Sequence, residues 1–358
     1  MQPDTSPESP PPESPLPESP LLTIAIPTYN RAEHLANLLA LLETQLTTLP
    51  QVELLVSDNA STDRTTDVIR DAQHRFASTG ALLTTHRHAT NIGADANFVS
   101  CYHRARGQFL WICGDDDLIV PGAVDQVIGH LQTSPDLDLI YATSYGFRSD
   151  PVAEWQGDPL HRRFHTIRDP RHFAMIVNIM FTFISGIIVN KSRLESLPHE
   201  PPEALLGTNL VQLSWSLPLL LHHRKSLVLW DRPVAARIGH AHGYELGKVF
   251  GEQLATTVTR LLPNRPDLSA PILNFALRRW LPSVVIDVRT DANQSLGLHD
   301  ATRALRRAYG SNPRFWIFTW PALTLPLPLA TLYTRATATL SKLIYIAHLP
   351  GFWRKQTN

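Results

Sequence analysis

Short apolar segments alternate with segments of helical periodicity over residues 21–144. The apolar segments are rich in Leu, Ile and Val, which is typical of strands that are buried on both faces of a parallel sheet. The predicted strands span residues 21–27, 52–58, 81–86, 107–113 and 137–144. The sequence therefore predicts an α/β fold with a mostly parallel sheet.

The segments between these strands predict helices. In residues 32–46 one helical face collects five leucines, namely Leu35, Leu38, Leu39, Leu42 and Leu46. Residues 61–76 open with Ser61 and Thr62 as candidate helix caps, and a further helix is expected after Pro121. Repeated strand–helix–strand units form right-handed sheets that bind ligands at the carboxyl ends of their strands.

The two ends of the chain differ from this pattern. Residues 1–20 repeat a PESP-like unit with little to bury, so we expect a disordered proline-rich tail before an α/β domain over 21–240. Residues 241–358 are expected to be helical. Within 315–355 the sequence is apolar and aromatic, with prolines that argue against a spanning helix. The basic residues beside the aromatic ones favour contact with a membrane surface, and a helical cap packed on the domain is the alternative.

Charge and cysteine content narrow the class of protein. Lys and Arg total 32 and so do Asp and Glu, so no global basic field indicates nucleic acid as a partner. The two cysteines, Cys101 and Cys113, are too few for a disulfide framework or a Cys-rich zinc site. They favour a reducing compartment, and the polar start of the chain lacks the features of a signal peptide. We therefore expect a cytoplasmic protein, at the inner face of the cytoplasmic membrane if 315–355 binds there.

Polar motifs follow the first three predicted strands. PTYNR (27–31) is expected to leave backbone N–H groups free for a phosphate or a base, or else to form an ordinary capped turn. In SDNASTD (57–63), Asp58 is placed to accept hydrogen bonds from a nucleoside, and Asp63 is expected to be structural. HATNIGADANF (88–98) gives a polar loop at a helix start, which suits either a diphosphate or helix capping.

Three consecutive aspartates follow the fourth strand in the stretch GDDD (114–117). Adjacent carboxylates repel one another, so the cluster lowers stability unless a cation or hydrogen-bond donors offset it. Mg²⁺ and Mn²⁺ prefer oxygen ligands, commonly carboxylates together with substrate phosphates. An acidic turn before a helix is the alternative interpretation.

These four motifs, in this order and spacing, resemble the nucleotide-binding half of family-2 glycosyltransferases with the GT-A fold. Over about residues 21–240 the sequence motifs are similar to those of the abequosyltransferase-like branch of this family. The resemblance implies an inverting transfer of a sugar from a nucleotide-diphosphate donor, with Mn²⁺ or Mg²⁺ as cofactor. It implies a glycan or polyprenyl-linked acceptor in the synthesis of bacterial surface polysaccharide.

The same resemblance assigns roles to individual residues. The GDDD stretch corresponds to the DXD region of the family, where Asp115 and Asp117 are the expected metal ligands; many relatives have aspartate where Gly114 stands here. The residues expected to contact the donor nucleotide are Pro27, Thr28, Tyr29, Arg31, Asp58, Asn91, Gly93, Asp115 and Asp116.

The acceptor side departs from the family pattern. Thr208 and Asn209 stand where relatives carry the acidic pair that supplies the catalytic base, so the nearby carboxylate Glu203 becomes the candidate base, with a solvated loop position as the alternative. Ser185 and Gly186 either line an acceptor pocket or belong to a core strand. Further along, Arg237, His240 and His242 are candidates for contact with phosphate oxygens.

The predicted activity is that of a metal-dependent hexosyl- or deoxyhexosyltransferase. A nucleotidyltransferase also combines an α/β sheet with metal-binding aspartates, but it needs a glycine-rich basic loop that PTYNR does not provide. A binding or scaffold protein with a degenerate site is the second alternative, since the acidic pair is missing.

Overall fold

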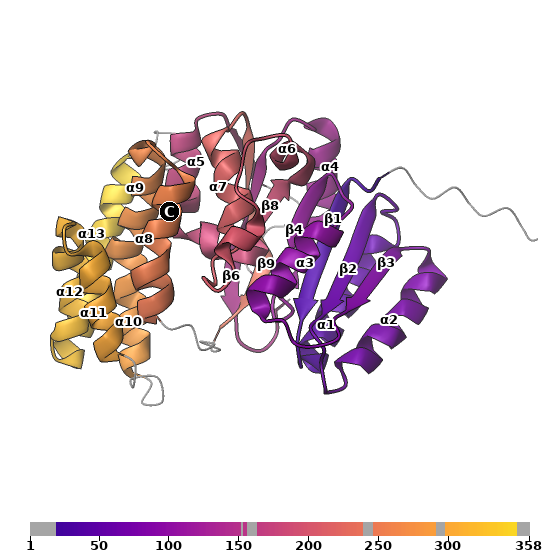
Figure 1. Cartoon of the computed structure of the whole chain (residues 1–358), viewed down its shortest axis with the longest axis horizontal. Coiled ribbons are helices and arrows are strands. Elements are labelled where there is room, and N and C mark those ends of the chain that lie inside the picture. The colour runs from indigo at the N-terminus through magenta and orange to yellow at the C-terminus, as the bar shows by residue number, and fades with distance from the viewer. Residues whose placement is uncertain (1–18, 152, 156–162, 239–245, 291–297, 349–358) are drawn as a thin grey trace, which may run out of the picture.

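A computed structural model describes residues 19–151, 153–155, 163–238, 246–290 and 298–348. Over these ranges the chain forms one sheet of nine strands with helices on both faces, and a group of helices follows at one end (Figure 1). The tail predicted over residues 1–20 lies almost entirely outside the described residues.

The first half of the sheet is parallel and follows the sequence prediction closely. Its strands run in the order β3-β2-β1-β4, and each predicted strand lies within two residues of the observed one. Their bounds are Leu22–Thr28 for β1, Val52–Asp58 for β2, Leu82–Arg87 for β3 and Phe109–Ile112 for β4.

The second half of the sheet is mixed. Strand β8 (Ile187–Asn190) lies between β4 and β6 (Leu139–Phe147) and is antiparallel to both, so β6 points the same way as β4 without touching it. Strand β9 (Ser226–Arg237) runs parallel to β6 and also pairs with β5 (Leu118–Ile119) and β7 (Phe164–Ile167). The carboxyl ends of β1, β2, β4, β6 and β9 therefore meet at one edge of the sheet.

Helices cover both faces because alternate strand residues point to opposite cores. Leu22, Ile24 and Ile26 of β1 pack with one set of helices, whereas Ala25 belongs to the core on the other face. The first set comprises α1 (Ala32–Leu46), α2 (Thr65–Thr79) and α4 (Ala123–Thr133); the second comprises α3 (Ala94–Arg104), α5 (Pro170–Val177) and α7 (Leu213–Leu221).

The leucine periodicity predicted helix α1 correctly, but the cap residues predicted for α2 were not the observed ones. All five leucines of the predicted face of α1 are buried, which confirms that periodicity. The caps predicted for α2 were wrong, because the helix begins at Thr65 and its backbone N–H donates to Asp63 Oδ1 at 3.0 Å rather than to Ser61 or Thr62. Asp63 therefore has the structural role that was expected for it.

The C-terminal helices extend the second core beyond the sheet. Buried side chains from Leu246 to Leu323 continue the cluster that lies under α5 and α7. Leu325 is extended, so a break precedes the last helix, as the prolines predicted. No helix in the described ranges is long and apolar enough to cross a membrane. The helices are α8 (Leu254–Leu261), α9 (Pro266–Phe275), α10 (Leu281–Thr290), α11 (Leu298–Tyr309), α12 (Trp320–Thr324) and α13 (Leu327–His348).

Candidate functional site

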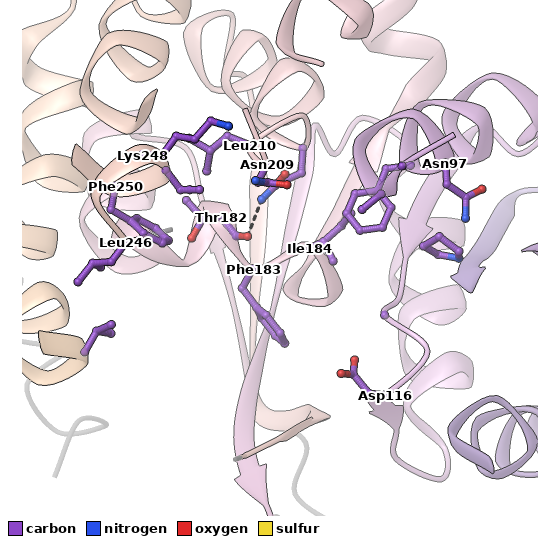
Figure 2. A pocket seen from close by; sticks show the side chains of 18 of the residues that line it. Asn97, Asp116, Thr182, Phe183, Ile184, Asn209, Leu210, Leu246, Lys248 and Phe250 are labelled. Atoms are coloured by element: carbon purple, nitrogen blue, oxygen red, sulfur yellow. Dashed lines mark hydrogen bonds between the residues drawn. The ribbon is translucent and has the colours of Figure 1, made fainter. Parts of the chain in front are cut away.

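A pocket of about 1480 Å³ opens at the edge where the strand carboxyl ends meet. Figure 2 shows Asn97 and Asp116 on the side of the parallel strands, and Leu246 and Phe250 on the side of the C-terminal helices. Eight of the nine residues predicted to contact the donor line this pocket. They are Pro27, Thr28, Tyr29, Arg31, Asn91, Gly93, Asp115 and Asp116.

The backbone N–H groups of Asn30 and Arg31 in the PTYNR turn are occupied, so of the two sequence interpretations the structure favours the ordinary turn over free N–H groups. The N–H of Asn30 donates to Ser61 Oγ at 2.9 Å and that of Arg31 to Thr65 Oγ1 at 3.1 Å. The left-handed backbone of Asn30 (φ 53°) also directs its side-chain oxygen to the N–H of Thr62 at 2.7 Å. The turn is therefore locked to the loop after β2, and the pocket receives its side chains rather than a helix N-terminus.

Asp58 is the predicted donor contact that does not line the pocket. Its side chain is 1% exposed, pairs with Arg87 at the end of β3, and accepts the N–H of Ser61 at 2.9 Å. Its neighbour Asn59 lines the pocket instead. Sequence reasoning missed Asn59 because an aspartate at a strand end gives the stronger signal for a nucleoside contact.

Asn59 also shapes the loop after β3. Its amide donates to Asn91 Oδ1 at 2.9 Å and to the Gly93 carbonyl at 3.2 Å, while its oxygen accepts the N–H of Ile92 at 2.9 Å. Gly93 has φ 87°, a conformation that favours glycine. Behind this loop Asn97 bonds to both the hydroxyl and the carbonyl of Ser57. Three loops thus form one hydrogen-bonded wall.

The three aspartates of the GDDD stretch have different surroundings. Asp115 accepts from the Thr28 hydroxyl at 2.7 Å and from Arg31 at 3.2 Å, and Arg31 also contacts Asp116 at 2.6 Å. Asp117 accepts from Ser185 Oγ at 2.6 Å and from the backbone N–H of Arg237 at 3.2 Å. The Asp116 side chain is 22% exposed, against 8% for that of Asp115.

Burial makes the ionised form of the two inner carboxyls unfavourable. It raises the pKa of Asp115 to about 6, against the opposing effect of Arg31. Burial also raises the pKa of Asp117 to about 7, and the neighbouring carboxylate of Asp116 adds to the shift while the Ser185 hydroxyl opposes it. The cluster is therefore electrostatically costly, although Arg31 offsets part of its charge.

The surroundings of Gly114 fit a divalent cation. A carbon placed on its Cα would lie 3.2 Å from Asp116 Oδ1 and 3.4 Å from Asp117 Oδ2, so glycine leaves room beside two carboxylate oxygens. In the described part of the chain, no group of three or more His, Cys, Asp or Glu side chains is arranged to hold a metal by itself. A cation here would need ligands from elsewhere, and Mg²⁺ commonly takes them from substrate phosphates.

The wall opposite the aspartates carries amides instead of the acidic pair. Asp95, at the start of α3, accepts the backbone N–H of Asn209 at 2.9 Å and fixes the turn that leads toward α7. Asn209 and Gln212 both line the pocket. The Gln212 amide donates to the Thr182 carbonyl at 2.6 Å, and its oxygen has no partner among the described residues. Spacing alone did not indicate Gln212.

Glu203 lies outside the residues that line this pocket. Its carboxylate is 2.7 Å from His103 Nε2, near the end of α3 that points away from the pocket, and its side chain is 48% exposed. Apart from the aspartate cluster, the carboxylates that do line the pocket are Glu252 and Asp300, both from the C-terminal helical region. Neither lies in a motif, so the sequence did not indicate them.

The other acceptor-side candidates have structural positions. Ser185 is fully buried, and its hydroxyl orients Asp117 and accepts the N–H of Gly114 at 2.9 Å. Gly186 is also buried, and neither residue lines the pocket. The sequence interpretation that placed them in an acceptor pocket is therefore wrong. The Arg237 guanidinium lies 4.7 Å from the ring centroid of Phe147. His240 and His242 fall outside the described residues.

Comparison with known sequences agrees with the motif order. Residues 23–187 match the model of glycosyl transferase family 2. The chain is 27% identical over 197 residues to abequosyltransferase RfbV of Salmonella typhimurium, covering 53% of this chain and 58% of that protein. A shorter stretch of 56 residues is 50% identical to validoxylamine A glucosyltransferase of Streptomyces hygroscopicus, covering 16% of this chain and 13% of that protein.

The chain thus spans about three-fifths of the length of the first of these relatives. Among solved structures, S. aureus TarS 1-349 in complex with UDP is similar, with a TM-score of 0.56 and 17% identity over 88% of each chain. TarS with UDP-GlcNAc gives a TM-score of 0.57 and 15% identity, over 88% of this chain and 89% of that one. The shared architecture confirms the GT-A fold with additional C-terminal helices.

Proposed function

We propose that this protein is an inverting glycosyltransferase, on the premise that residues 23–187 place it in glycosyl transferase family 2. The observation that carries the proposal is the convergence of three loops and the aspartate cluster on one pocket. The donor is a nucleotide-diphosphate sugar, and the UDP and UDP-GlcNAc in the TarS structures support that class. The similarity to an abequosyltransferase supports a role in polysaccharide synthesis.

Different pocket residues have different roles in a single-displacement reaction. Tyr29, Asn59, Asn91 and Gly93 would hold the nucleotide against the strand ends, and Arg31 would face the diphosphate. The acceptor oxygen attacks the anomeric carbon as the bond to the diphosphate oxygen breaks, so the configuration inverts. A base removes the proton of the acceptor hydroxyl.

Mn²⁺ or Mg²⁺ would be held by the aspartate cluster and by donor phosphate oxygens. Such a cation neutralises the charge that builds on the departing diphosphate. The sequence assigned Asp115 and Asp117 as its ligands. The greater exposure of Asp116 leads us to propose it as a ligand through Oδ1, the oxygen beside Gly114, while its Oδ2 accepts from Arg31. Asp115 and Asp117 are more buried and accept hydrogen bonds from Thr28 and from Ser185.

The acceptor is proposed to be a glycan or a polyprenyl-linked glycan. The far side of the pocket supports an apolar portion, because its lining includes Leu246, Phe250, Trp280, Val284 and Val288. Cys101 and Cys113 are both free and buried, which supports a reducing, cytoplasmic compartment. Contact with the membrane through 315–355 would bring the pocket to such an acceptor.

Nucleotide binding tests the proposal directly. We expect one of UDP, GDP, CDP and dTDP to bind with Mn²⁺ and much more weakly after chelation, because the cation would offset the negative charge of the aspartate cluster and of the diphosphate. Isothermal titration calorimetry measures this, with the matching nucleoside monophosphate as control. If a folded sample binds none of the four nucleotides, either with Mn²⁺ or after chelation, the GDDD stretch is an acidic turn and the scaffold alternative is favoured.

The position of Glu203 gives a second prediction. We expect Glu203→Gln to keep transfer within about threefold of the unchanged protein, because the side chain is exposed and paired with His103. Glu200→Gln is a matched control, since its side chain is 44% exposed and pairs with Arg260. A specific loss of about 100-fold or more in Glu203→Gln would instead identify Glu203 as the base that the sequence predicted.

A further inference from the structure

Basic and acidic residues are segregated along the chain, although their totals are equal. Of the 32 Lys and Arg residues, eight lie in residues 301–358, where no Asp or Glu occurs. The preceding residues therefore carry an acidic excess. Because the protein as a whole has no net charge, only the positive segment 301–358 is attracted to an anionic surface. The protein would bind such a surface with this segment toward it and the rest of the molecule away from it.

The same segment exposes a group of large apolar side chains. Trp316, Ile317, Leu329 and Leu332 are 40%, 51%, 56% and 67% exposed, and they are four of the nine large hydrophobic side chains that are exposed in the described chain. The hydroxyl of Tyr333 donates to the Ile317 carbonyl at 2.7 Å, so α13 lies beside the π-helix Phe315–Thr319. We call these four side chains the apolar face.

Arginines border the apolar face. The Arg306 guanidinium carbon lies 5.8 Å from the ring centroids of both Trp316 and Trp320, so the charge sits on the aromatic surface. Arg335 is exposed and follows Leu332 by three residues on α13. Aromatic rings and arginines side by side are typical of the membrane–water interface, where the ring is buried and the charge meets headgroups.

Helix α11 connects this face to the pocket. Ala301 and Ala304 line the pocket, with Ala301 packed against Gly247 and Ala304 against Gly251. Arg306 lies two residues beyond Ala304, about 200° around the helix, on the opposite side. A surface bound by the apolar face would therefore lie one helix away from the apolar wall of the pocket.

We propose that the apolar face and its arginines bind the surface of a bilayer that contains anionic phospholipids. The inference deepens the membrane contact of the proposed function and is independent of which nucleotide the pocket binds. A second copy of the chain is the less favourable occupant, because two such faces would bring like charges together. The helices would lie in the interface with Trp316, Ile317, Leu329 and Leu332 among the acyl chains.

Flotation of the full-length protein with vesicles tests this. We expect binding to vesicles of equimolar phosphatidylcholine and phosphatidylglycerol, weaker binding in high salt, and little binding to pure phosphatidylcholine. The double variant Ile317→Ser, Leu332→Ser should bind more weakly by about tenfold or more, because it removes two exposed apolar side chains from the interface. Arg335→Gln should reduce binding to the mixed vesicles and the dependence on salt.

Phe164→Ser is the matched control, since Phe164 is 47% exposed but belongs to β7. It should bind vesicles as the unchanged protein does. Nucleotide binding by every variant is measured in parallel, so that loss of folding or of the donor site is distinguished from loss of membrane binding. The proposal is overturned if the protein does not float with mixed vesicles, or if light scattering shows a dimer that the double variant converts to a monomer.

Discussion

Asparagine in place of Asp116 is expected to weaken Mn²⁺-dependent nucleotide binding by about 100-fold or more, with little effect on folding. The substitution keeps the size of the side chain and removes its charge. Asp116 is the most exposed carboxylate of the cluster at 22%, and one of its oxygens lies beside the space left by Gly114. Without this carboxylate the cluster would hold a cation more weakly, and the charge of the diphosphate would be less well offset.

Asp116→Asn should weaken nucleotide binding without lowering the stability of the fold. Three adjacent carboxylates repel, so removing one charge relieves Asp115 and Asp117 while it gives up one contact with Arg31. We therefore expect the melting temperature of Asp116→Asn to stay close to that of the unchanged protein or to rise. A residue that served only the fold would instead lower it.

Two comparisons complete this test. Asp125→Asn, at an exposed aspartate in the first turn of α4, should leave binding unchanged and lower the melting temperature only slightly, because a favourable charge at a helix N-terminus is lost. Asp117→Asn separates the two assignments of the metal ligands. If Asp117→Asn abolishes metal-dependent binding while Asp116→Asn leaves it intact, the ligands are those that the sequence predicted, and the exposure of Asp116 has no bearing on the metal.

The elements that the sequence predicted are those with local causes. The leucines of α1 repeat at helical spacing, and burying them requires a helix wherever the strands lie. The apolar segments of β1, β2 and β4 could be recognised for the same reason. Their parallel order also fixed which loops would share an edge, so PTYNR and GDDD were correctly expected to meet.

The features that were missed depend on partners distant in the sequence. Strand β8 pairs with β4 and β6, and this pairing depends on the strands available to it in the folded sheet. The residues of β8 alone do not indicate which strands these are. Asp58 is an aspartate whether it contacts a nucleoside or Arg87, which lies 29 residues later. Glu252 and Asp300 reach the pocket only because the C-terminal helices pack beside it.

Alanine in place of Gly107 is expected to destabilise the fold strongly, at a site distant from the pocket. A Cβ at this position would lie 2.4 Å from the backbone nitrogen of Thr23 and 2.7 Å from the carbonyl oxygen of Phe109. Both atoms belong to the paired strands β1 and β4, so no side-chain rotation relieves the overlap. Separating these strands would cost more than about 3 kcal/mol, a large share of the stability of a typical domain.

The same separation should disturb the pocket, because β1 and β4 carry PTYNR and GDDD at their carboxyl ends. Gly107→Ala should therefore melt several degrees lower, by about 5 °C or more, and lose nucleotide affinity in the fraction that remains folded. Gly129→Ala is the matched control. Gly129 is an exposed residue within α4, and apart from its two chain neighbours and the backbone of its own helix no atom lies within 4 Å of the position that a Cβ would take there. Alanine should therefore stabilise the helix by about 0.5–1 kcal/mol. Equal melting of the two variants would mean that β1 and β4 can separate at Gly107 without cost, and that the close pairing of these strands does not position the site.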